Sequence, residues 1–343
     1  MYDMIFVTHL PAFYKVNLYN EIAKYKKIYV LFIGTGSTIR TKDFCDFNMN
    51  FEHSFFFNDS YEKINLFNSL IKVINFLRKV NYDKLVLGGW DKSVLWMFAF
   101  LSPKKKNYTV IESSIYESKV HGLYLTIKKL YKCRMSGVFV SGEPQKLLAK
   151  KIGYKNIIIT GGVGLFNRVS YEKQEKFFNK RFLFIGRLSE EKNLFFLIDI
   201  FKSLSDASLE IIGNGPLKED ILKHIDGLSN IKYYPHIENN LIYKKYLEND
   251  IFILPSIKEP WGLVIEEALY YGLPVIVSNK VGSKDDMVLK YNSGKIVDIN
   301  CKDDFTQAIE YFCNEENYNN IKSNVEKIDF DQLITNQIES YNI

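Results

Sequence analysis

Short apolar runs alternate with amphipathic helical periods along the 343-residue chain. In the first half, the runs that we expect to form buried strands are Met4–Val7, Ile28–Ile33, Lys84–Leu87, Tyr108–Ile111, Gly137–Val140 and Ile157–Thr160. In the second half, they are Phe182–Ile185, Ser208–Ile212, Ile231–Tyr234, Ile251–Leu254, Val275–Val277 and Gly294–Val297. Helical spacing lies between them, as at Lys63–Lys79 and Glu143–Lys151. This alternation is typical of parallel sheets with right-handed crossovers, so we expect an α/β fold of two doubly wound, Rossmann-like domains, residues 1–165 and 166–343.

The segment that starts at Glu259 predicts a loop followed by a helix with a free N-terminus. Pro260 fixes the backbone before the helix, Gly262 has no side chain to block approach, and Leu263 begins the helical spacing. The first N–H groups of a helix lack intrahelical partners, so backbone at Gly262, Leu263 and Val264 is suited to a phosphate. Glu259 and Glu267, on either side, could accept hydrogen bonds from sugar hydroxyls. Two surface glutamates on a solvated helix explain this segment about equally well.

A second segment places two cations after a strand. The buried run Phe182–Ile185 leads into Arg187 and Lys192, and we expect Ser189 to cap the helix that follows. Ligands bind at the carboxyl ends of strands in open parallel sheets. The planar fork of an arginine and the point charge of a lysine both suit phosphate oxygens. Considered alone, the two residues fit ordinary solvated cations better.

Four motifs occur in a fixed order: Gly186-Arg187-Leu188-x-x-Glu191-Lys192, Gly213-Asn214-Gly215-Pro216, Leu254-Pro255-Ser256, and Glu259-x7-Glu267. Together they resemble the C-terminal half of retaining glycosyltransferases of family 4. Each motif alone is weak, whereas the set with its order and spacing is specific. The likeness is looser in the first half, where Tyr82–Trp90 and Gly161–Phe166 are similar to segments of some bacterial polysaccharide enzymes of the family.

The resemblance implies a GT-B fold, in which the first domain binds the acceptor, the second binds a nucleotide sugar, and the last helix packs on the first. It implies that Arg187 and Lys192 bind the donor diphosphate and stabilise its charge as the glycosidic bond breaks. By the same resemblance, Glu259 contacts the transferred sugar and Glu267 the ribose. No metal is required, because cations take its place. The family has no agreed protein nucleophile, and we do not assign Glu259 as one.

Other candidate residues carry weaker signals. Gly213 and Gly215 would let backbone approach the nucleotide, although a strand-to-helix turn explains them nearly as well. Many members of the family carry a histidine where this chain has Glu112, which could bind the sugar or act on the acceptor hydroxyl. A structural role for Glu112 is about as probable. His9, after the first strand, could border the acceptor, although a lone histidine is more often structural.

The residues and the resemblance together predict an enzyme that moves a sugar from a nucleotide donor, UDP- or GDP-linked, to a glycan acceptor. We expect that acceptor to be lipid-linked, in the synthesis of bacterial surface polysaccharide or glycoconjugate, with no further cofactor and no metal. A sugar-nucleotide epimerase of the same architecture is a weaker alternative. A non-catalytic nucleotide-binding subunit of a transferase complex is another.

Charge is divided unevenly along the chain. Residues 1–165 hold 24 Lys+Arg and 12 Asp+Glu, a net of +12, which leaves 21 and 28, a net of −7, for residues 166–343. In Lys128–Arg134, cations lie beside an apolar helical face of Leu123, Ile127, Leu130 and Tyr131, which suggests an anionic membrane surface or simply a solvated helix. No nucleic-acid motif accompanies the charge. The four cysteines lack metal-ligand spacing and fit a reducing cytoplasm, so we expect a cytoplasmic protein. From the basic segment, we expect it to be peripheral at the inner face of the membrane.

Overall fold

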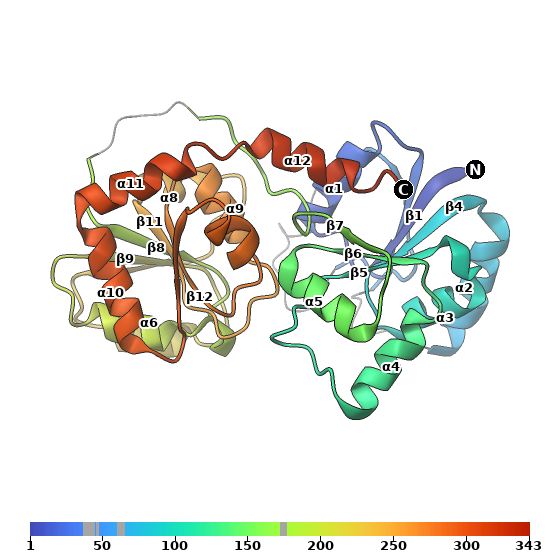
Figure 1. Cartoon of the computed structure of the whole chain (residues 1–343), viewed down its shortest axis with the longest axis horizontal. Helices are drawn as coiled ribbons and strands as arrows, with labels where there is room; N and C mark the ends of the chain where they lie inside the picture. Colours follow the sequence, from blue (N-terminus) through green and yellow to red (C-terminus); the bar gives the residue numbers. More distant parts are fainter. Residues whose placement is uncertain (37–44, 46–47, 60–65, 172–176) are drawn as a thin grey trace. The chain divides into compact units, whose positions relative to one another are not determined.

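The computed structural model describes the chain except for residues 37–44, 46–47, 60–65 and 172–176 (Figure 1). It divides into two compact units. Unit 1 comprises Met1–Asn167 and Asp331–Ile343, and unit 2 comprises Arg168–Phe330. Each unit is built on one parallel β-sheet, as the sequence predicted.

Unit 1 contains a seven-stranded sheet in the order β3-β2-β1-β4-β5-β6-β7. Its strands are β1 (Tyr2–Thr8), β2 (Ile28–Phe32), β3 (Glu52–Phe55), β4 (Tyr82–Leu87), β5 (Asn107–Ile111), β6 (Gly137–Val140) and β7 (Ile157–Ile159). Successive side chains of a strand alternate between the two faces of its sheet. Accordingly, Ile5 and Val7 join one buried cluster, whereas Met4 and Phe6 join another. The strands read as continuous apolar runs because both faces of the sheet are covered.

Helices cover the two faces of this sheet unequally. They are α1 (Phe13–Ile22), α2 (Leu66–Lys79), α3 (Ser93–Leu101), α4 (Gly122–Lys132), α5 (Glu143–Ile152) and α12 (Phe330–Glu339). Helices α2 to α5 contribute Val73, Phe98, Tyr131 and Leu148 to the cluster that holds Ile5. Helix α1 and the C-terminal segment pack on the opposite face.

The end of the chain belongs to unit 1 because Tyr341 packs in its core. The Tyr341 ring stacks on Phe139 at a centroid distance of 4.6 Å and meets Phe6 edge-on at 5.8 Å. Its side chain is 5% exposed. Residues 331–343 therefore return to the sheet formed by the first part of the chain.

Unit 2 contains a six-stranded sheet in the order β10-β9-β8-β11-β12-β13. Its strands are β8 (Arg181–Ile185), β9 (Ser208–Ile212), β10 (Ile231–Tyr234), β11 (Ile251–Leu254), β12 (Val275–Ser278) and β13 (Gly294–Val297). Its helices are α6 (Leu194–Phe201), α7 (Lys218–Ile225), α8 (Tyr243–Glu248), α9 (Leu263–Tyr270), α10 (Lys302–Cys313) and α11 (Glu315–Val325). In both sheets the order reverses beside the first strand, which is the Rossmann pattern.

The sequence predicted every described strand except β3. Among the described strands, Glu52–Phe55 lies at the edge of the sheet and pairs with β2, and its side chains are half-buried or exposed. It therefore lacks the apolar run that identified the other strands. Of the expected helix at Lys63–Lys79, the first three residues lie outside the described part, and α2 covers the rest from Leu66.

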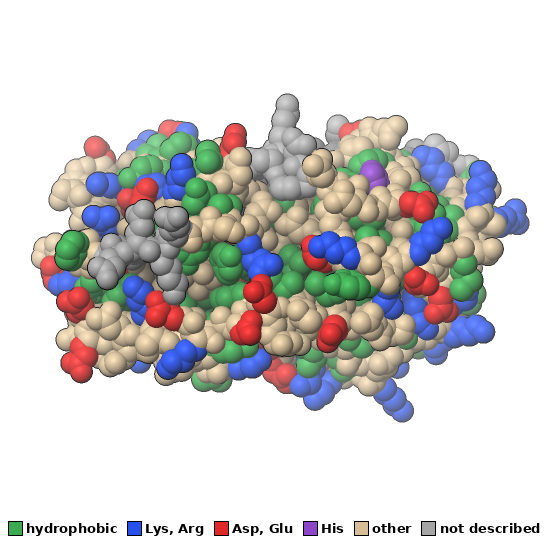
Figure 2. Space-filling view, turned by 90° about the horizontal axis from the view of Figure 1, so that it is seen from above, with side chains coloured by type: hydrophobic (Ala, Val, Ile, Leu, Met, Phe, Trp, Pro, Cys, Tyr) green, Lys and Arg blue, Asp and Glu red, His purple; other side chains and the backbone are tan. Residues whose placement is uncertain are grey.

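The surface of the molecule carries both signs of charge. On the face that Figure 2 shows, cationic and acidic side chains are interspersed with apolar ones. Among the described residues, none of the helices combines the length and the hydropathy that crossing a bilayer requires.

The packing of Tyr341 makes the C-terminal segment a structural part of unit 1. We expect Tyr341→Ala to lower the free energy of unfolding by about 3–5 kcal/mol, the usual cost of truncating a large buried aromatic ring. Denaturant unfolding followed by circular dichroism measures the change. The neighbouring Asn342→Ala, at an exposed position, serves as the control. Equal stability of the two variants would contradict the assignment of Tyr341 to the core.

Candidate functional site

The reversal of strand order in unit 2 brings two loops together. Strand β8 pairs with β9 on one side and with β11 on the other, so the loops after β8 and β11 leave the same edge of the sheet. The Ile257 amide donates to the Glu191 carbonyl oxygen at 2.9 Å and joins the two loops. Arg187, Lys192 and Glu259 therefore lie in one neighbourhood, at the edge where parallel sheets bind ligands.

Lys192 and Glu259 form an ion pair across these loops. The Lys192 ammonium donates to Glu259 Oε2, and the Ser256 hydroxyl lies 3.5 Å from the same oxygen. Both side chains are largely withdrawn from solvent, with 15% and 12% of their surface exposed. Removing one partner of a pair this buried leaves the other charge uncompensated. One cation and one carboxylate are thus held together at the carboxyl edge of the sheet, and each keeps a small exposed surface.

Arg187 and Glu191 complete the charged loop after β8. Partial burial opposes ionisation of Glu191, but the Ser189 hydroxyl, the backbone and the charges of Lys192 and Arg187 together lower its pKa. The Ser189 hydroxyl donates to Glu191 Oε1 at 2.6 Å. The prediction that Ser189 caps a helix is wrong, because a short 3₁₀ helix follows it and α6 begins after Asn193.

The N-terminus of α9 lies beside this pair. Gly262 has φ = +92°, a conformation that favours glycine, and it immediately precedes Leu263. The Gly282 amide donates to the Glu259 carbonyl oxygen at 2.9 Å and so fixes the loop. The first N–H groups of α9, including those of Leu263 and Val264, lie at the positive end of the helix dipole. This end of the helix is suited to an anion.

Two successive glutamates of α9 each accept a hydrogen bond from an aromatic side chain. Trp261 donates its indole N–H to the buried Glu266 carboxylate, and burial raises the pKa of Glu266 to about 8. The Tyr246 hydroxyl donates to Glu267 Oε2 at 2.7 Å. Burial raises the pKa of Glu267 to about 7. Sequence reasoning identified Glu267 but missed Glu266 and Tyr246, because α8 has no apolar period that would place Tyr246 against α9.

The glycines after β9 meet backbone of the neighbouring loop. A Cβ on Gly213 would lie 1.9 Å from the Gly186 carbonyl oxygen, and one on Gly215 would lie 2.3 Å from that of Leu188. The Leu188 amide also donates to the Asn214 carbonyl oxygen at 3.0 Å. Close packing of two loops therefore explains both glycines, without a ligand.

Unit 1 has a corresponding edge, where the loops after the paired strands β1 and β4 diverge. His9 follows β1 and lies 2.8 Å, Nε2 to Oδ1, from Asp91, which follows β4. Partial burial opposes ionisation of Asp91, but the hydrogen bond and charge of His9 lower its pKa. The sequence singled out His9 and missed Asp91, which no motif marked.

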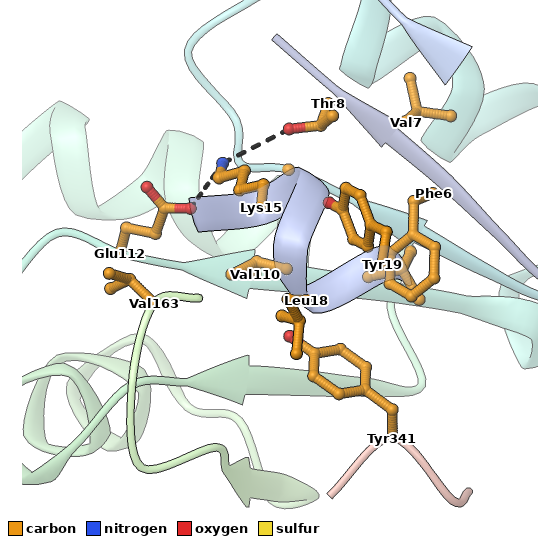
Figure 3. A pocket seen from close by; sticks show the side chains of 12 residues that line it. Phe6, Val7, Thr8, Lys15, Leu18, Tyr19, Val110, Glu112, Val163 and Tyr341 are labelled. Carbon is orange, nitrogen blue, oxygen red and sulfur yellow. Dashed lines mark hydrogen bonds and ion pairs between the residues drawn. The ribbon is translucent and has the colours of Figure 1, made fainter. Parts of the chain in front are cut away.

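Glu112, after β5, is paired with a lysine that the sequence did not single out. Lys15 Nζ, on α1, lies 2.7 Å from Glu112 Oε1 and 3.4 Å from the Thr8 hydroxyl (Figure 3). Burial opposes the charge on Lys15, but Glu112 outweighs it and raises the Lys15 pKa. The pair borders a cavity of about 20 Å³, enough for about one water molecule.

The basic segment of unit 1 differs from the sequence prediction in two residues. Leu123, Ile127 and Leu130 face outward on α4, but Tyr131 is buried and donates its hydroxyl to the Gly89 carbonyl oxygen. Arg134 donates to the carbonyl oxygens of residues 99, 100 and 102 at the end of α3. It therefore caps that helix and is not a free surface cation.

The site holds no evident metal-ligand cluster. Among the residues that the structure describes, no three His, Cys, Asp or Glu side chains come close enough together to hold a metal ion. Cations, a helix N-terminus and carboxylates are the groups that unit 2 offers to a ligand. Such a set suits a phosphate with attached hydroxyls.

This region is similar to known proteins. Residues 167–328 match the family model described as glycosyl transferases group 1. A sulfoquinovosyl transferase, SQD2, of Arabidopsis thaliana is 32% identical over 111 residues, which are 32% of this chain and 21% of that protein. A 41.2 kDa protein of the cps region of Klebsiella pneumoniae is 28% identical over 59% of this chain and 60% of that protein. The capsular polysaccharide biosynthesis glycosyltransferase CapM of Staphylococcus aureus is 26% identical over 64% of each chain. The chain thus spans between about a fifth and two thirds of these relatives.

Solved structures share the fold over nearly the whole chain. The sucrose-phosphate synthase of Thermosynechococcus elongatus has a TM-score of 0.72 at 15% identity, covering 99% of this chain and 98% of that one. HepE of Anabaena, solved with UDP, has a TM-score of 0.71 at 14% identity and 97% coverage of both chains. The two parallel-sheet domains are those of the GT-B fold, which the sequence predicted.

The buried Glu266 makes the stability of unit 2 depend on pH. Its pKa is raised from 4.5 to about 8 on folding, so the folded state binds the extra proton between these values. Stability is therefore greatest at the acid end of this window and falls as pH rises toward 8. We expect Glu266→Gln, which keeps an acceptor for Trp261, to flatten the fall in Tm between pH 5 and 8. Glu315→Gln, on the exposed start of α11, is the control, and an unchanged slope in Glu266→Gln would contradict the burial argument.

Proposed function

We propose that this chain, whose residues 167–328 match the family model of glycosyl transferases group 1, is a retaining glycosyltransferase. It moves a sugar from a nucleotide donor to a glycan acceptor in the synthesis of a bacterial surface polysaccharide. The observation that carries the proposal is the buried Lys192–Glu259 pair beside the N-terminus of α9. The matches to CapM and to a protein of a cps region support the polysaccharide class.

In this proposal unit 2 binds the donor. Arg187, Lys192 and the amides at the start of α9 hold the diphosphate, Glu267 accepts the ribose hydroxyls and Glu259 contacts the transferred sugar. As the bond from the anomeric carbon to the phosphate oxygen breaks, these cations stabilise the charge of the leaving group without a metal. The acceptor oxygen attacks on the same face and its proton passes to the departing phosphate. The carbon keeps its configuration.

The nucleotide is the first property to test. UDP is favoured because HepE, a structural neighbour, was solved with it, and GDP is the second choice. A ligand that binds only the folded state raises Tm, so UDP-, GDP-, ADP- and TDP-sugars can be ranked by thermal shift. A sugar altered by the protein in the absence of acceptor would indicate an epimerase instead. No shift with any of the four would contradict the donor assignment.

Removing either donor-site cation is expected to weaken donor binding strongly. A charge-assisted contact to phosphate contributes about 1.5–3 kcal/mol, so Arg187→Ala and Lys192→Ala should each weaken binding about 10- to 150-fold. Titration calorimetry with the best nucleotide sugar measures this. Lys223→Ala, at a lysine 80% exposed on α7, is the matched control and should bind normally. Near-normal affinity in both site variants contradicts the assignment, and a chelator should leave transfer unchanged.

Glu259 and Glu267 should differ in which kinetic parameter they affect. A ribose contact persists through the reaction, so Glu267→Gln should raise KM, whereas Glu259→Gln should lower kcat because its contact tightens as the bond breaks. Because burial raises the pKa of Glu267 to about 7, a larger share of this carboxyl is ionised at higher pH, and we expect wild-type KM to fall from pH 6 to pH 8. That trend should vanish in Glu267→Gln and persist in Glu266→Gln. The reverse kinetic split would mean that the two roles are exchanged.

We further propose that the acceptor is lipid-linked and that unit 1 binds an anionic membrane surface. Unit 1 holds 24 Lys+Arg and 14 Asp+Glu, a net of +10, and α4 exposes apolar residues beside its lysines. Near an anionic leaflet each cation contributes about 1 kcal/mol, less at high salt. Such binding is peripheral and depends on charge.

Two lysines of α4 test this binding. We expect Lys129→Gln with Lys132→Gln to reduce binding to anionic liposomes about 30-fold at low salt, in a flotation assay. The matched control is Lys150→Gln with Lys151→Gln, two exposed lysines at the end of α5. Donor binding should be the same in both double variants. A wild-type protein that ignores anionic liposomes would favour an acceptor that is not lipid-linked.

A further inference from the structure

Unit 1 contains a cavity that the proposed chemistry does not use. It has a volume of about 340 Å³, near the lower end of typical ligand pockets. Its walls come from the loop between β4 and α3, α3 itself, the loop before α4, and α4. The lining residues are Trp90, Trp96, Glu117, Ser118, Lys119, Tyr124, Ile127 and Lys128.

The lining is chiefly aromatic and aliphatic. Trp96 packs against Tyr131 at a centroid distance of 4.9 Å and donates its indole N–H to the Trp90 carbonyl oxygen at 2.7 Å. Glu117 Oε1 accepts from the Ser114 amide at 2.9 Å. These polar groups already have partners inside the protein. A sugar, whose many hydroxyls need hydrogen bonds, is therefore a poorer match for this cavity than an apolar chain.

An exposed apolar stripe of α4 continues from the cavity. Ile127 lines the cavity and is 43% exposed, and Leu123 and Leu130 on the same outward face are 73% and 54% exposed. Contiguous exposed apolar surface of this kind marks an interaction site in a folded protein. The cavity therefore opens among side chains that water solvates poorly.

Two lysines, Lys119 and Lys128, outnumber the one carboxylate, Glu117, among the lining residues. The Lys128 ammonium lies 5.7 Å from the centre of the Trp90 ring, and that of Lys119 lies 5.0 Å from the centre of the Tyr124 ring. Lys128 also donates to the Lys119 carbonyl oxygen at 2.6 Å, which holds the two residues together. Partial burial lowers the pKa of Lys128, so its ammonium gains from an anion beside it. The cavity thus combines apolar walls with a cationic rim.

We propose that this cavity binds the hydrocarbon chain of a membrane lipid that carries a phosphate, with the phosphate at Lys119 and Lys128. The chain lies against Trp90, Trp96 and Ile127. The lysine stems cover apolar wall while their charged ends meet the phosphate. The proposal goes beyond charge-driven surface binding, because it predicts one saturable site for a single amphiphile. It rests on unit 1 alone and not on the donor site of unit 2.

Tryptophan fluorescence gives a direct assay. The chain has three tryptophans, of which Trp90 and Trp96 line the cavity and Trp261 belongs to unit 2. The probe is a twelve-carbon alkyl phosphate brominated on its chain, below its micelle concentration, because bromine quenches an indole that it contacts. We expect saturable quenching at one site per chain. Inorganic phosphate alone should neither quench nor displace the probe.

Different variants test the binding of the alkyl chain and of the phosphate group of the probe. Ile127→Glu should weaken binding at least tenfold, whereas Leu147→Glu, at an exposed apolar position of α5, should not. Lys119→Gln with Lys128→Gln should weaken the alkyl phosphate about tenfold but leave an uncharged alkyl maltoside of equal chain length unchanged. Circular dichroism verifies that each variant is folded. The Lys129/Lys132 double variant should lose liposome binding and keep the probe.

Several results overturn the proposal. They are quenching that does not saturate, quenching that Ile127→Glu leaves intact, equal binding of the phosphate and the maltoside, and displacement of the probe by a short oligosaccharide. The last would make the cavity a sugar subsite. Because the assay contains no nucleotide sugar, failure of donor binding and failure of this site are recorded separately.

Discussion

The reversal of strand order beside the first strand of each sheet is the constraint on which both charged edges depend. Right-handed crossovers place successive strands on one side of the first strand and then on the other. The loops that follow the two central strands consequently diverge and leave space between them. In unit 2 these loops carry Lys192 and Glu259, and in unit 1 they carry His9 and Asp91. The two members of each of these pairs meet because the sheet reverses between their strands.

The Lys192–Glu259 pair also keeps two largely buried charges of unit 2 compensated. An isolated charge that is largely withdrawn from solvent is costly, and each partner of this pair offsets the desolvation of the other. A diphosphate that approached Lys192 would compete with Glu259 for the ammonium. In the proposed function this exchange frees the carboxylate for the transferred sugar at the moment when the donor arrives.

The sequence was sufficient to predict the strands and helices with strong apolar periodicity. It was not sufficient to predict side-chain contacts between elements. Buried strands such as Ile251–Leu254 were predicted with the observed bounds because both faces of a parallel sheet are covered. The edge strand β3 was missed, since exposed residues such as Glu52 and His53 form no apolar run. Motif spacing identified Arg187, Lys192, Glu259 and Glu267. Their roles remain predictions.

Partners that come from outside the motifs were not predictable. Lys15 lies on α1 and meets Glu112 after β5, a separation of 97 residues that no local pattern encodes. Tyr246 and Asp91 were missed for the same reason. Gly213 and Gly215 show the opposite problem. Their place in a motif predicted a ligand, but glycine is needed at both positions because a Cβ would meet backbone of the neighbouring loop.

The two lysine–glutamate pairs show why charge alone does not define a ligand site. Lys15–Glu112 and Lys192–Glu259 are both pairs of one lysine and one glutamate. Both pairs lie at the carboxyl edge of a sheet. The Lys15–Glu112 pair borders space for about one water molecule. Both pairs also lie beside a helix N-terminus, since Lys15 is in the first turn of α1 and the Lys192–Glu259 pair lies beside the start of α9. The two pairs therefore differ in the space beside them and not in their charges, because the small cavity beside Lys15 and Glu112 is too small for a phosphate.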